Sequence, residues 1–244
     1  MIYLTSDLHF NHNKEFIYAP RGFTNVQDMN NTIIQNFNKI VKFDDDVYIL
    51  GDLMLGGADK QAEGLELIAA LNGKLHLVRG NHDTEKRWAA YKELHNVVEM
   101  DNAIYLNYRK YHFYMSHFPT MTANLEKESL HQCTINLFGH THQITNFYNE
   151  IPFMYHVGLD SHNMTPVLLD DAIEEMKRKV IECKNELGEE PDSITHEAPT
   201  LVSNVVPRPR CEKCVYSYPG CGHSDSFGQC RDYRRDPPDG GYYG

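Results

Sequence analysis

The stretch that decides the fold is Leu77-Val78-Arg79-Gly80-Asn81-His82-Asp83. It continues an apolar run that starts at Leu75, and a short apolar run ending at a glycine is typical of a buried strand whose chain bends as it leaves the sheet. Asn81, His82 and Asp83 then lie beyond the strand's C-terminal end, where layered α/β folds bind ligands. An amide oxygen, an imidazole that titrates near neutral pH and a carboxylate together favour a functional site over a polar turn.

Four other apolar runs, at residues 2–5, 47–50, 111–115 and 134–138, are also followed at once by metal-ligand residue types. The residues that follow them are Asp7-Leu8-His9, Gly51-Asp52, Ser116-His117 and Gly139-His140-Thr141-His142. Spacing and composition alone therefore predict a polynuclear metal site built on strand ends.

In chain order these blocks read D-x-H, GD, GNHD, H and GHTH. The set resembles the calcineurin-like metallophosphoesterases, over roughly the first 170 residues. The resemblance implies that one metal is bound by Asp7, His9, Asp52 and His142, and a second by Asp52, Asn81, His117 and His140. Mixed nitrogen and oxygen ligands favour manganese, iron, zinc, nickel or cobalt over calcium.

The same resemblance assigns roles outside the ligand set. It implies that His82 binds no metal, faces the substrate and protonates the leaving oxygen, with Asp83 orienting it. Asn11, His12 and Arg21 follow the first strand and either line the phosphate site or are solvated loop residues.

The resemblance implies a dinuclear, metal-dependent hydrolase in which a metal-bridging hydroxide attacks phosphorus. Residues 51–57 lack the Asp-Arg-Gly of the superfamily's protein serine/threonine phosphatases and symmetrical dinucleoside tetraphosphatases. We therefore expect a compact bacterial or phage-type phosphodiesterase that acts on cyclic nucleotides, nucleotide phosphodiesters or RNA ends. The alternatives are a phosphomonoesterase and a non-catalytic binding scaffold, since the retromer subunit of this superfamily serves as a platform. The intact ligand set favours the enzyme.

Early strands alternate with helical patterns and later strands pair as hairpins, which predicts a mixed α/β fold. The expected architecture is a four-layer α/β/β/α sandwich with two mixed sheets face to face. Helices are expected at residues 26–41 after a Thr24–Gln27 capping box, and at 59–71, 84–94, 122–132 and 170–187. Hairpin turns are expected at residues 109–110 and 149–150.

The metallophosphoesterase domain is expected to span residues 1–187, followed by a proline-punctuated linker at 188–210 and a Cys-rich tail at 211–244. The tail contains Cys211, Cys214, Cys221 and Cys230, spaced Cys-x2-Cys-x6-Cys-x8-Cys. Four such thiols could hold one structural zinc, and the alternatives are a redox-labile or a disordered tail. The final residues, rich in Pro, Gly and Asp, are expected to be disordered.

The 244 residues include 23 Lys plus Arg and 34 Asp plus Glu, a formal net charge of −11. So acidic a chain argues against non-specific binding of long nucleic acid, but bound divalent cations would still admit a small phosphorylated substrate such as a nucleotide. No apolar run is long enough to span a bilayer, and the first residues show no signal-peptide pattern. We therefore expect a cytoplasmic protein with no membrane partner.

Overall fold

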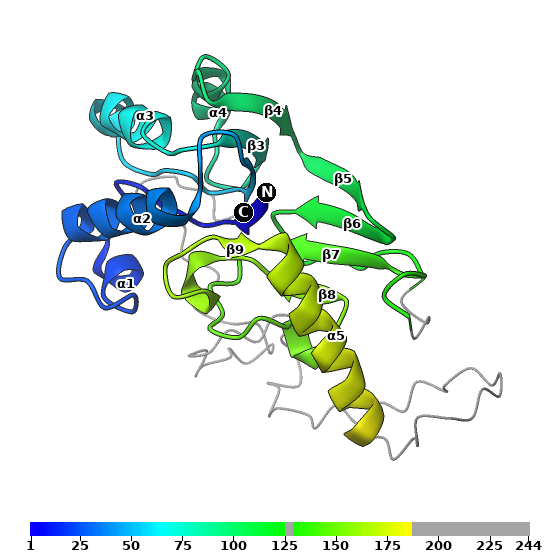
Figure 1. The fold of residues 1–244 in the computed structure, drawn as a ribbon. Helices are drawn as coiled ribbons and strands as arrows, with labels where there is room; N and C mark the ends of the chain where they lie inside the picture. The colour runs from blue at the N-terminus through cyan, green and yellow to red at the C-terminus, as the bar shows by residue number, and fades with distance from the viewer. Residues whose placement is uncertain (125–128, 187–244) are drawn as a thin grey trace, which may run out of the picture. The chain divides into compact units, whose positions relative to one another are not determined.

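The structure is a computed structural model that describes residues 1–124 and 129–186. Two β-sheets form its centre (Figure 1). The five-stranded sheet contains, in spatial order, β4 (Val97–Asp101), β3 (Lys74–Val78), β2 (Asp46–Leu50), β1 (Ile2–Thr5) and β9 (Val167–Leu168). The four-stranded sheet contains β5 (Ala103–Tyr108), β6 (Tyr111–Ser116), β7 (Thr134–Phe138) and β8 (Met154–His156). Both sheets are mixed, because β9 and β5 each run antiparallel to a neighbour in an otherwise parallel sheet.

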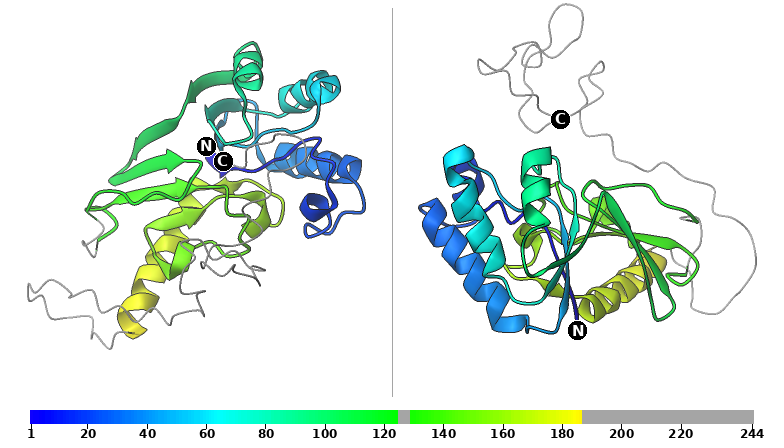
Figure 2. Two further views of the ribbon diagram at one scale, coloured as in Figure 1. Left: turned by 180° about the vertical axis from the view of Figure 1, so that it is seen from behind. Right: turned by 90° about the horizontal axis from the view of Figure 1, so that it is seen from above.

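Helices flank the sheets, and those at residues 26–40, 61–69 and 85–91 cover one face of the five-stranded sheet (Figure 2). The helices are α1 (Glu15–Tyr18), α2 (Val26–Ile40), α3 (Gln61–Ala69), α4 (Glu85–Tyr91) and α5 (Leu169–Glu186). Short 3-10 turns lie at η1 (Ala58–Lys60), η2 (Tyr148–Glu150) and η3 (Leu159–Ser161). The predicted mixed α/β fold with two helix-flanked sheets is confirmed.

Two apolar cores lie on opposite faces of the five-stranded sheet. On one face, Ile49 and Leu77 pack with Met29, Ile33 and Phe37 of α2. On the other face, Leu50 and Val78 pack with Phe113 and Leu137 of the second sheet and with Met176 of α5. Since successive side chains of a strand point to opposite faces, the central strands are buried on both sides, which explains their continuous apolar composition.

Local elements depart from expectation in four places. Strand β4 is not predicted, because as a half-exposed edge strand it lacks an apolar run. Helix α2 is capped by Asn25, whose side chain accepts from the Asp28 amide at 2.9 Å, so the predicted Thr24–Gln27 capping box is wrong. The described parts of 122–132, residues 122–124 and 129–132, form turns and bends rather than a helix. The hairpin at 149–150 is reduced to one bridge between Phe147 and Tyr155, because β8 pairs in parallel with β7.

The predicted linker at 188–210, the four tail cysteines and the chain's last residues lie outside the described residues. The domain boundary near residue 187 and the structural zinc therefore stay predictions. Within the described ranges, no helix combines the length and the apolar character that crossing a membrane requires.

One edge gathers the C-terminal ends of five strands from both sheets. Strands β1, β2 and β3 run parallel to one another, as do β6 and β7. Main-chain hydrogen bonds join the loops that leave them: Asp7 N–H donates to the Gly51 carbonyl at 3.0 Å, and Gly139 N–H donates to the His117 carbonyl at 3.0 Å. His140 N–H also donates to Asp7 Oδ2 at 2.9 Å, which joins a loop of each sheet, so the two sheets present their strand-end loops to a single site.

Candidate metal centre and active site

The loops at this edge bend sharply directly after each strand. Six non-glycine residues there have φ values in the left-handed region: Asp7 57°, His9 51°, Asn11 60°, Asp52 55°, His140 67° and His142 47°. Such conformations cost about 1–3 kcal/mol each and persist where the surrounding structure imposes them. Here the contacts that impose these conformations include main-chain hydrogen bonds, such as the one from His9 N–H to the Asp52 carbonyl at 3.0 Å. The strain is concentrated on residues that carry ligand-type side chains.

The first side-chain group consists of Asp7, His9 and His142. The Nε2 atoms of His9 and His142 lie 3.1 Å apart. The Oδ1 atom of Asp7 lies 3.8 Å from His9 Nε2 and 3.9 Å from His142 Nε2. Three potential ligand atoms from β1 and β7 loops thus converge on one point.

The second group consists of Asn81, His117 and His140. Asn81 Oδ1 lies 2.8 Å from His117 Nε2 and 3.0 Å from His140 Nδ1, and the two imidazole nitrogens are 3.2 Å apart. These side chains come from the loops after β3, β6 and β7. The second group therefore joins the two sheets.

Asp52 lies between the two groups. Its Oδ2 atom is 3.7 Å from His9 Nε2 and 3.5 Å from His117 Nε2, and Asp7 also comes close to Asp52 and His117. Two glycines permit this packing, because a Cβ on Gly80 would lie 2.2 Å from Asp52 Oδ1 and one on Gly139 would lie 2.5 Å from Asp7 Oδ2.

The donor set fits divalent transition-metal ions. Asp7 Oδ1 is buried and has no hydrogen-bond partner among the described residues, although such an atom normally has one. It faces Nε2 of His9 and Nε2 of His142, and these two nitrogens also face each other. A cation between the three atoms would be a partner for each of them. Imidazole nitrogens with carboxylate and amide oxygens are the ligands that such ions take.

The protonation states suit metal binding. Burial, followed by the nearby His117, lowers the pKa of His140 to about 4. Burial also lowers the pKa of His9 well below its usual value, with His142 adding to the effect. Both rings are therefore neutral near pH 7 and offer a lone pair. Burial raises the pKa of Asp52 to about 7, against the lowering effect of His117.

His82 lies beside this cluster, partly open to solvent. Its ring is 38% exposed, and Nε2 lies 3.9 Å from Asp52 Oδ2. Its main-chain N–H donates to Asp52 Oδ1 at 2.9 Å. Burial lowers the pKa of the imidazole from its usual value, although the nearby Asp83 opposes that shift. The ring is thus placed to reach a group bound over the cluster.

Asp83 holds the loops rather than the His82 ring. Its Oδ2 accepts from the main-chain amides of Asp52 and Gly80, both at 2.8 Å. Its Oδ1 accepts from Leu53 N–H at 3.3 Å and from the Tyr91 hydroxyl at 3.1 Å. These four donors bind both oxygens of the Asp83 carboxylate, which the family resemblance expects to orient His82. The carboxylate connects the loop after β2 to the loop after β3.

Sequence reasoning missed a buried ion pair behind His142. Asp160, in η3, accepts from His142 Nδ1 at 2.8 Å and from Arg21 Nε and Nη2 at 2.8 and 2.9 Å. Arg21 also donates to the Asp7 carbonyl at 2.8 Å. Burial would raise the pKa of Asp160, but the hydrogen bonds from His142 and Arg21 outweigh it and hold the pKa far below its usual range.

The three remaining candidates, Arg21, Asn11 and His12, are buried rather than solvated. Arg21 is buried in that ion pair and does not line a phosphate site. Asn11 is also buried, and its amide pairs with Asn30, 2.8 Å away. His12 is buried beside His9, with their Nδ1 atoms 3.1 Å apart.

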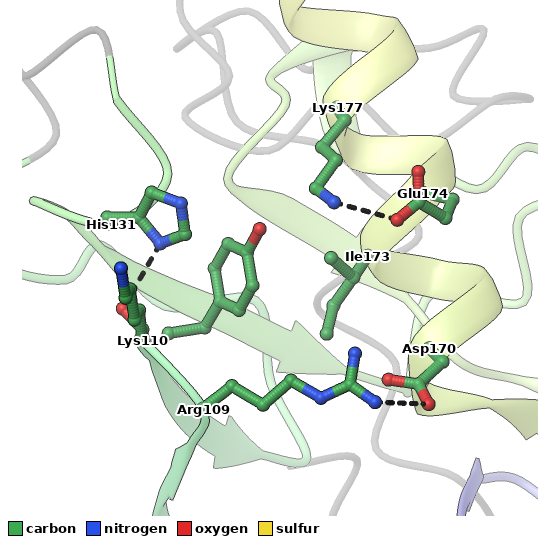
Figure 3. Close-up of a pocket in the computed structure, with 8 residues that line it drawn as sticks. Arg109, Lys110, His131, Asp170, Ile173, Glu174 and Lys177 are labelled. Atoms are coloured by element: carbon green, nitrogen blue, oxygen red, sulfur yellow. Dashed lines mark hydrogen bonds and ion pairs between the residues drawn. The ribbon is translucent and has the colours of Figure 1, made fainter.

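A hollow of about 270 Å³ at the opposite end of β6 does not compete as the active site (Figure 3). It lies between the β5–β6 turn and α5. Four of the charged residues that line it form two pairs: Arg109 contacts Asp170 at 3.1 Å and Lys177 contacts Glu174 at 2.7 Å. The convergent ligand atoms lie at the other end of the sheet.

The chain is similar to proteins from an archaeon, a phage and a bacterium. The uncharacterized protein MJ1445 of Methanocaldococcus jannaschii is 35% identical over 195 aligned residues, covering 76% of this chain and 97% of that protein. Gene 66 protein of Mycobacterium phage D29 is 26% identical, covering 74% and 98%. A solved protein of unknown function from Aquifex aeolicus shares the fold, with a TM-score of 0.52 and 24% identity over 72% of this chain and 98% of that one.

The family comparison covers every block of the cluster. Residues 1–158 match the model of the calcineurin-like phosphoesterase superfamily domain. These residues include all five motif blocks, from Asp7 to His142, and they confirm the resemblance that the blocks indicate. The chain belongs to the calcineurin-like phosphoesterase superfamily.

Proposed function

We propose that this protein is a dinuclear metal-dependent phosphodiesterase. The observation that carries the proposal is the position of Asp52 Oδ2 between two convergent ligand groups, 3.7 Å from His9 Nε2 and 3.5 Å from His117 Nε2. One carboxylate oxygen shared between two ligand groups suits a pair of metal ions about 3.5–4 Å apart.

Each group would hold one ion of manganese, iron, zinc, nickel or cobalt. Asp7, His9, Asp52 and His142 would hold one, and Asp52, Asn81, His117 and His140 the other. When bound, such a pair supplies a nucleophilic water at neutral pH and neutralises the non-bridging phosphate oxygens.

The chain's own groups would orient the ligands and move the proton. Asp160 accepts from His142 Nδ1 and so leaves Nε2 free to face the cluster. His82, beside the cluster and partly exposed, would donate a proton from its ring to the leaving oxygen. Asp83 would keep the loops of Asp52 and His82 in register through its four hydrogen bonds.

The charge of the site favours a diester over a monoester. Arg21, Arg79 and Arg87, on the loops and helix around the cluster, contact protein groups: Arg21 contacts Asp160, Arg79 contacts Glu85, and Arg87 donates to the carbonyls of His82 and Gly56. A phosphomonoester dianion would gain most from a free guanidinium, which binds phosphate in a bidentate manner. A diester carries one negative charge and needs less compensation.

The test is turnover of matched aryl phosphates with added manganese. We expect bis(4-nitrophenyl) phosphate to be hydrolysed at least about tenfold more efficiently than 4-nitrophenyl phosphate, and chelation to abolish both rates. A preference for the monoester would favour a phosphomonoesterase. Metal binding without turnover of either compound would favour the non-catalytic scaffold.

Asp160→Asn is expected to weaken metal binding by about 10–100-fold, the usual effect of removing a carboxylate that orients a histidine ligand. An asparagine lacks the charge that pairs with Arg21 and holds His142. Calorimetric titration of manganese into the metal-free protein would measure the loss, and excess manganese should restore most of the activity. Asp170→Asn, which changes a carboxylate at the far end of the sheet, is the control. Unchanged metal affinity in Asp160→Asn would remove this residue from the site.

A further inference from the structure

The ring of His82, the group assigned to proton transfer, is not held by a hydrogen bond. Within residues 1–124 and 129–186, no protein group hydrogen-bonds the ring, and Asp52 Oδ2 lies 3.9 Å from its Nε2 atom. A proton donor acts only within about 2.6–3.2 Å of the atom that takes the proton. The Asp83 carboxylate, which the family resemblance expects to orient the ring, binds four other donors. Another contact must therefore hold His82 in place.

The main chain of His82 is fixed on both sides. Its N–H donates to Asp52 Oδ1 at 2.9 Å. Its carbonyl accepts from Arg87 Nη1 at 2.7 Å and from Thr84 N–H at 3.1 Å. Thr84 belongs to the same turn as His82, whereas Asp52 follows β2 and Arg87 lies in α4. The place of the His82 ring relative to the rest of the site therefore depends on Asp52 and Arg87.

Arg87 joins two loops from its position in the first turn of α4. While Nη1 binds the His82 carbonyl, Nη2 of the same guanidinium donates to the Gly56 carbonyl at 2.7 Å. Gly56 lies in the loop after β2. Because a guanidinium is planar and presents its donors in a rigid fork, the two bonds fix the distance and direction between the two carbonyls.

The loop after β2 is bound in turn to the loop after β1, which carries the first ligand group. Leu55 N–H donates to the Phe10 carbonyl at 2.8 Å. Phe10 directly follows His9, whose ring centroid lies 5.6 Å from that of His82. A continuous set of main-chain contacts therefore runs from His82 through Arg87 to the loop of the first ligand group.

Arg87 is separate from the ligand side chains. In the part of the chain that the structure describes, both guanidinium contacts of Arg87 are to main-chain carbonyls. The loops that carry Asp52 and Asn81 are held independently, because Asp83 accepts from the Asp52 and Gly80 amides at 2.8 Å. Removal of Arg87 should therefore release the His82 end of its loop and leave the metal ligands in place.

We propose that Arg87 is a positioning residue that holds His82 within reach of the leaving oxygen. The inference rests on the proposed role of His82 as the proton donor. As the bond from phosphorus to the leaving oxygen breaks, that oxygen takes a proton from the His82 ring, and Arg87 acts only through the place of this ring. Loss of Arg87 should therefore slow the reactions whose leaving oxygen needs a proton.

The test compares Arg87→Met with the wild type on two diesters of similar shape, diphenyl phosphate and bis(4-nitrophenyl) phosphate. We expect kcat on diphenyl phosphate to fall by about 10–100-fold, since a misplacement of about 1 Å can cost 10²-fold. On bis(4-nitrophenyl) phosphate, whose leaving group needs little protonation, the loss should be less than about threefold. Metal content and KM should not change. Lys86→Met, at an exposed position of the same helical turn, is the matched control.

A double-mutant cycle separates positioning from a general loss of structure. In the His82→Ala background, Arg87→Met should change kcat on diphenyl phosphate by less than about twofold, because no ring is left to place. Additive losses, equal losses on the two diesters, no loss on diphenyl phosphate, or loss of a metal would each overturn the inference. If Arg87→Met does not fold, Arg87→Lys, which keeps the charge but not the fork, replaces it in the same cycle.

A measurement without turnover separates this inference from the phosphodiesterase activity. In the zinc-loaded full-length protein, NMR should show the His82 main-chain amide exchanging with solvent at least about tenfold faster in the Arg87 variant than in the wild type. The Asp52 amide, which Asp83 holds, should exchange as in the wild type. If the wild type hydrolyses neither diester, the phosphodiesterase function fails, and exchange at His82 alone decides whether Arg87 holds this residue. Unchanged exchange at His82 would overturn the inference.

Discussion

Asp52→Asn is expected to lower kcat/KM on an aryl phosphodiester by about 10³-fold or more, a larger loss than substitution of any ligand that belongs to one group only. Asp52 Oδ2 faces both His9 and His117, while Oδ1 accepts from the His82 amide at 2.9 Å. An asparagine has one oxygen and no charge. It can keep the bond to His82 or face the ligand groups, but it cannot do both.

Metal content measured alongside the rate would show whether the loss has this cause. Asp52→Asn should bind fewer metal ions than the wild type under the same loading, while His9→Ala and His140→Ala should each weaken one site. Asp101→Asn, an exposed carboxylate on β4, should behave as the wild type. A fully active wild-type enzyme with a single metal ion per chain would refute the dinuclear assignment and with it the special position of Asp52.

His82→Ala is expected to keep both metals and to lower kcat by about 10²–10⁴, the usual worth of a positioned proton donor. The alanine retains the main-chain N–H that donates to Asp52 Oδ1, so the bridging carboxylate should stay in place. The loss should be greatest for alkoxide leaving groups, which need a proton. It should shrink for 4-nitrophenolate, which leaves without one.

Rates across a series of leaving groups, with metal content on the same samples, test this role. His95→Ala, an exposed histidine in the loop after α4, is the matched control and should change neither quantity. Loss of a metal in His82→Ala would make His82 a ligand. A loss of equal size for every leaving group would make it a phosphate-binding residue rather than an acid.

The central strands could be predicted from the sequence, because a strand that is buried on both faces appears as a short run of apolar residues. The apolar runs at residues 2–5, 47–50 and 75–78 predict strands, and the structure has strands at Ile2–Thr5, Asp46–Leu50 and Lys74–Val78. The edge strand β4 was not predicted, and the helix predicted at 122–132 is wrong in its described parts, because half-exposed segments carry no such pattern. Helix α2 begins at residue 26 as expected, but its cap is Asn25 rather than Thr24, since both residue types are acceptable caps.

The sequence by itself determined which residue types follow which strands, and so the five motif blocks and the family. That information is local: each block is a strand end and its loop, and parallel strands bring such ends to one edge whatever the other contacts are. Only the tertiary structure decided the pairing of Asp160 with His142 and Arg21, and the turning of Asp83 towards the main-chain amides of Asp52 and Gly80. It also decided that Arg87 binds the carbonyls of His82 and Gly56. Arg21 and Asp160 are 139 positions apart, and contacts at such separations depend on the packing of both sheets, which no local pattern in the sequence records.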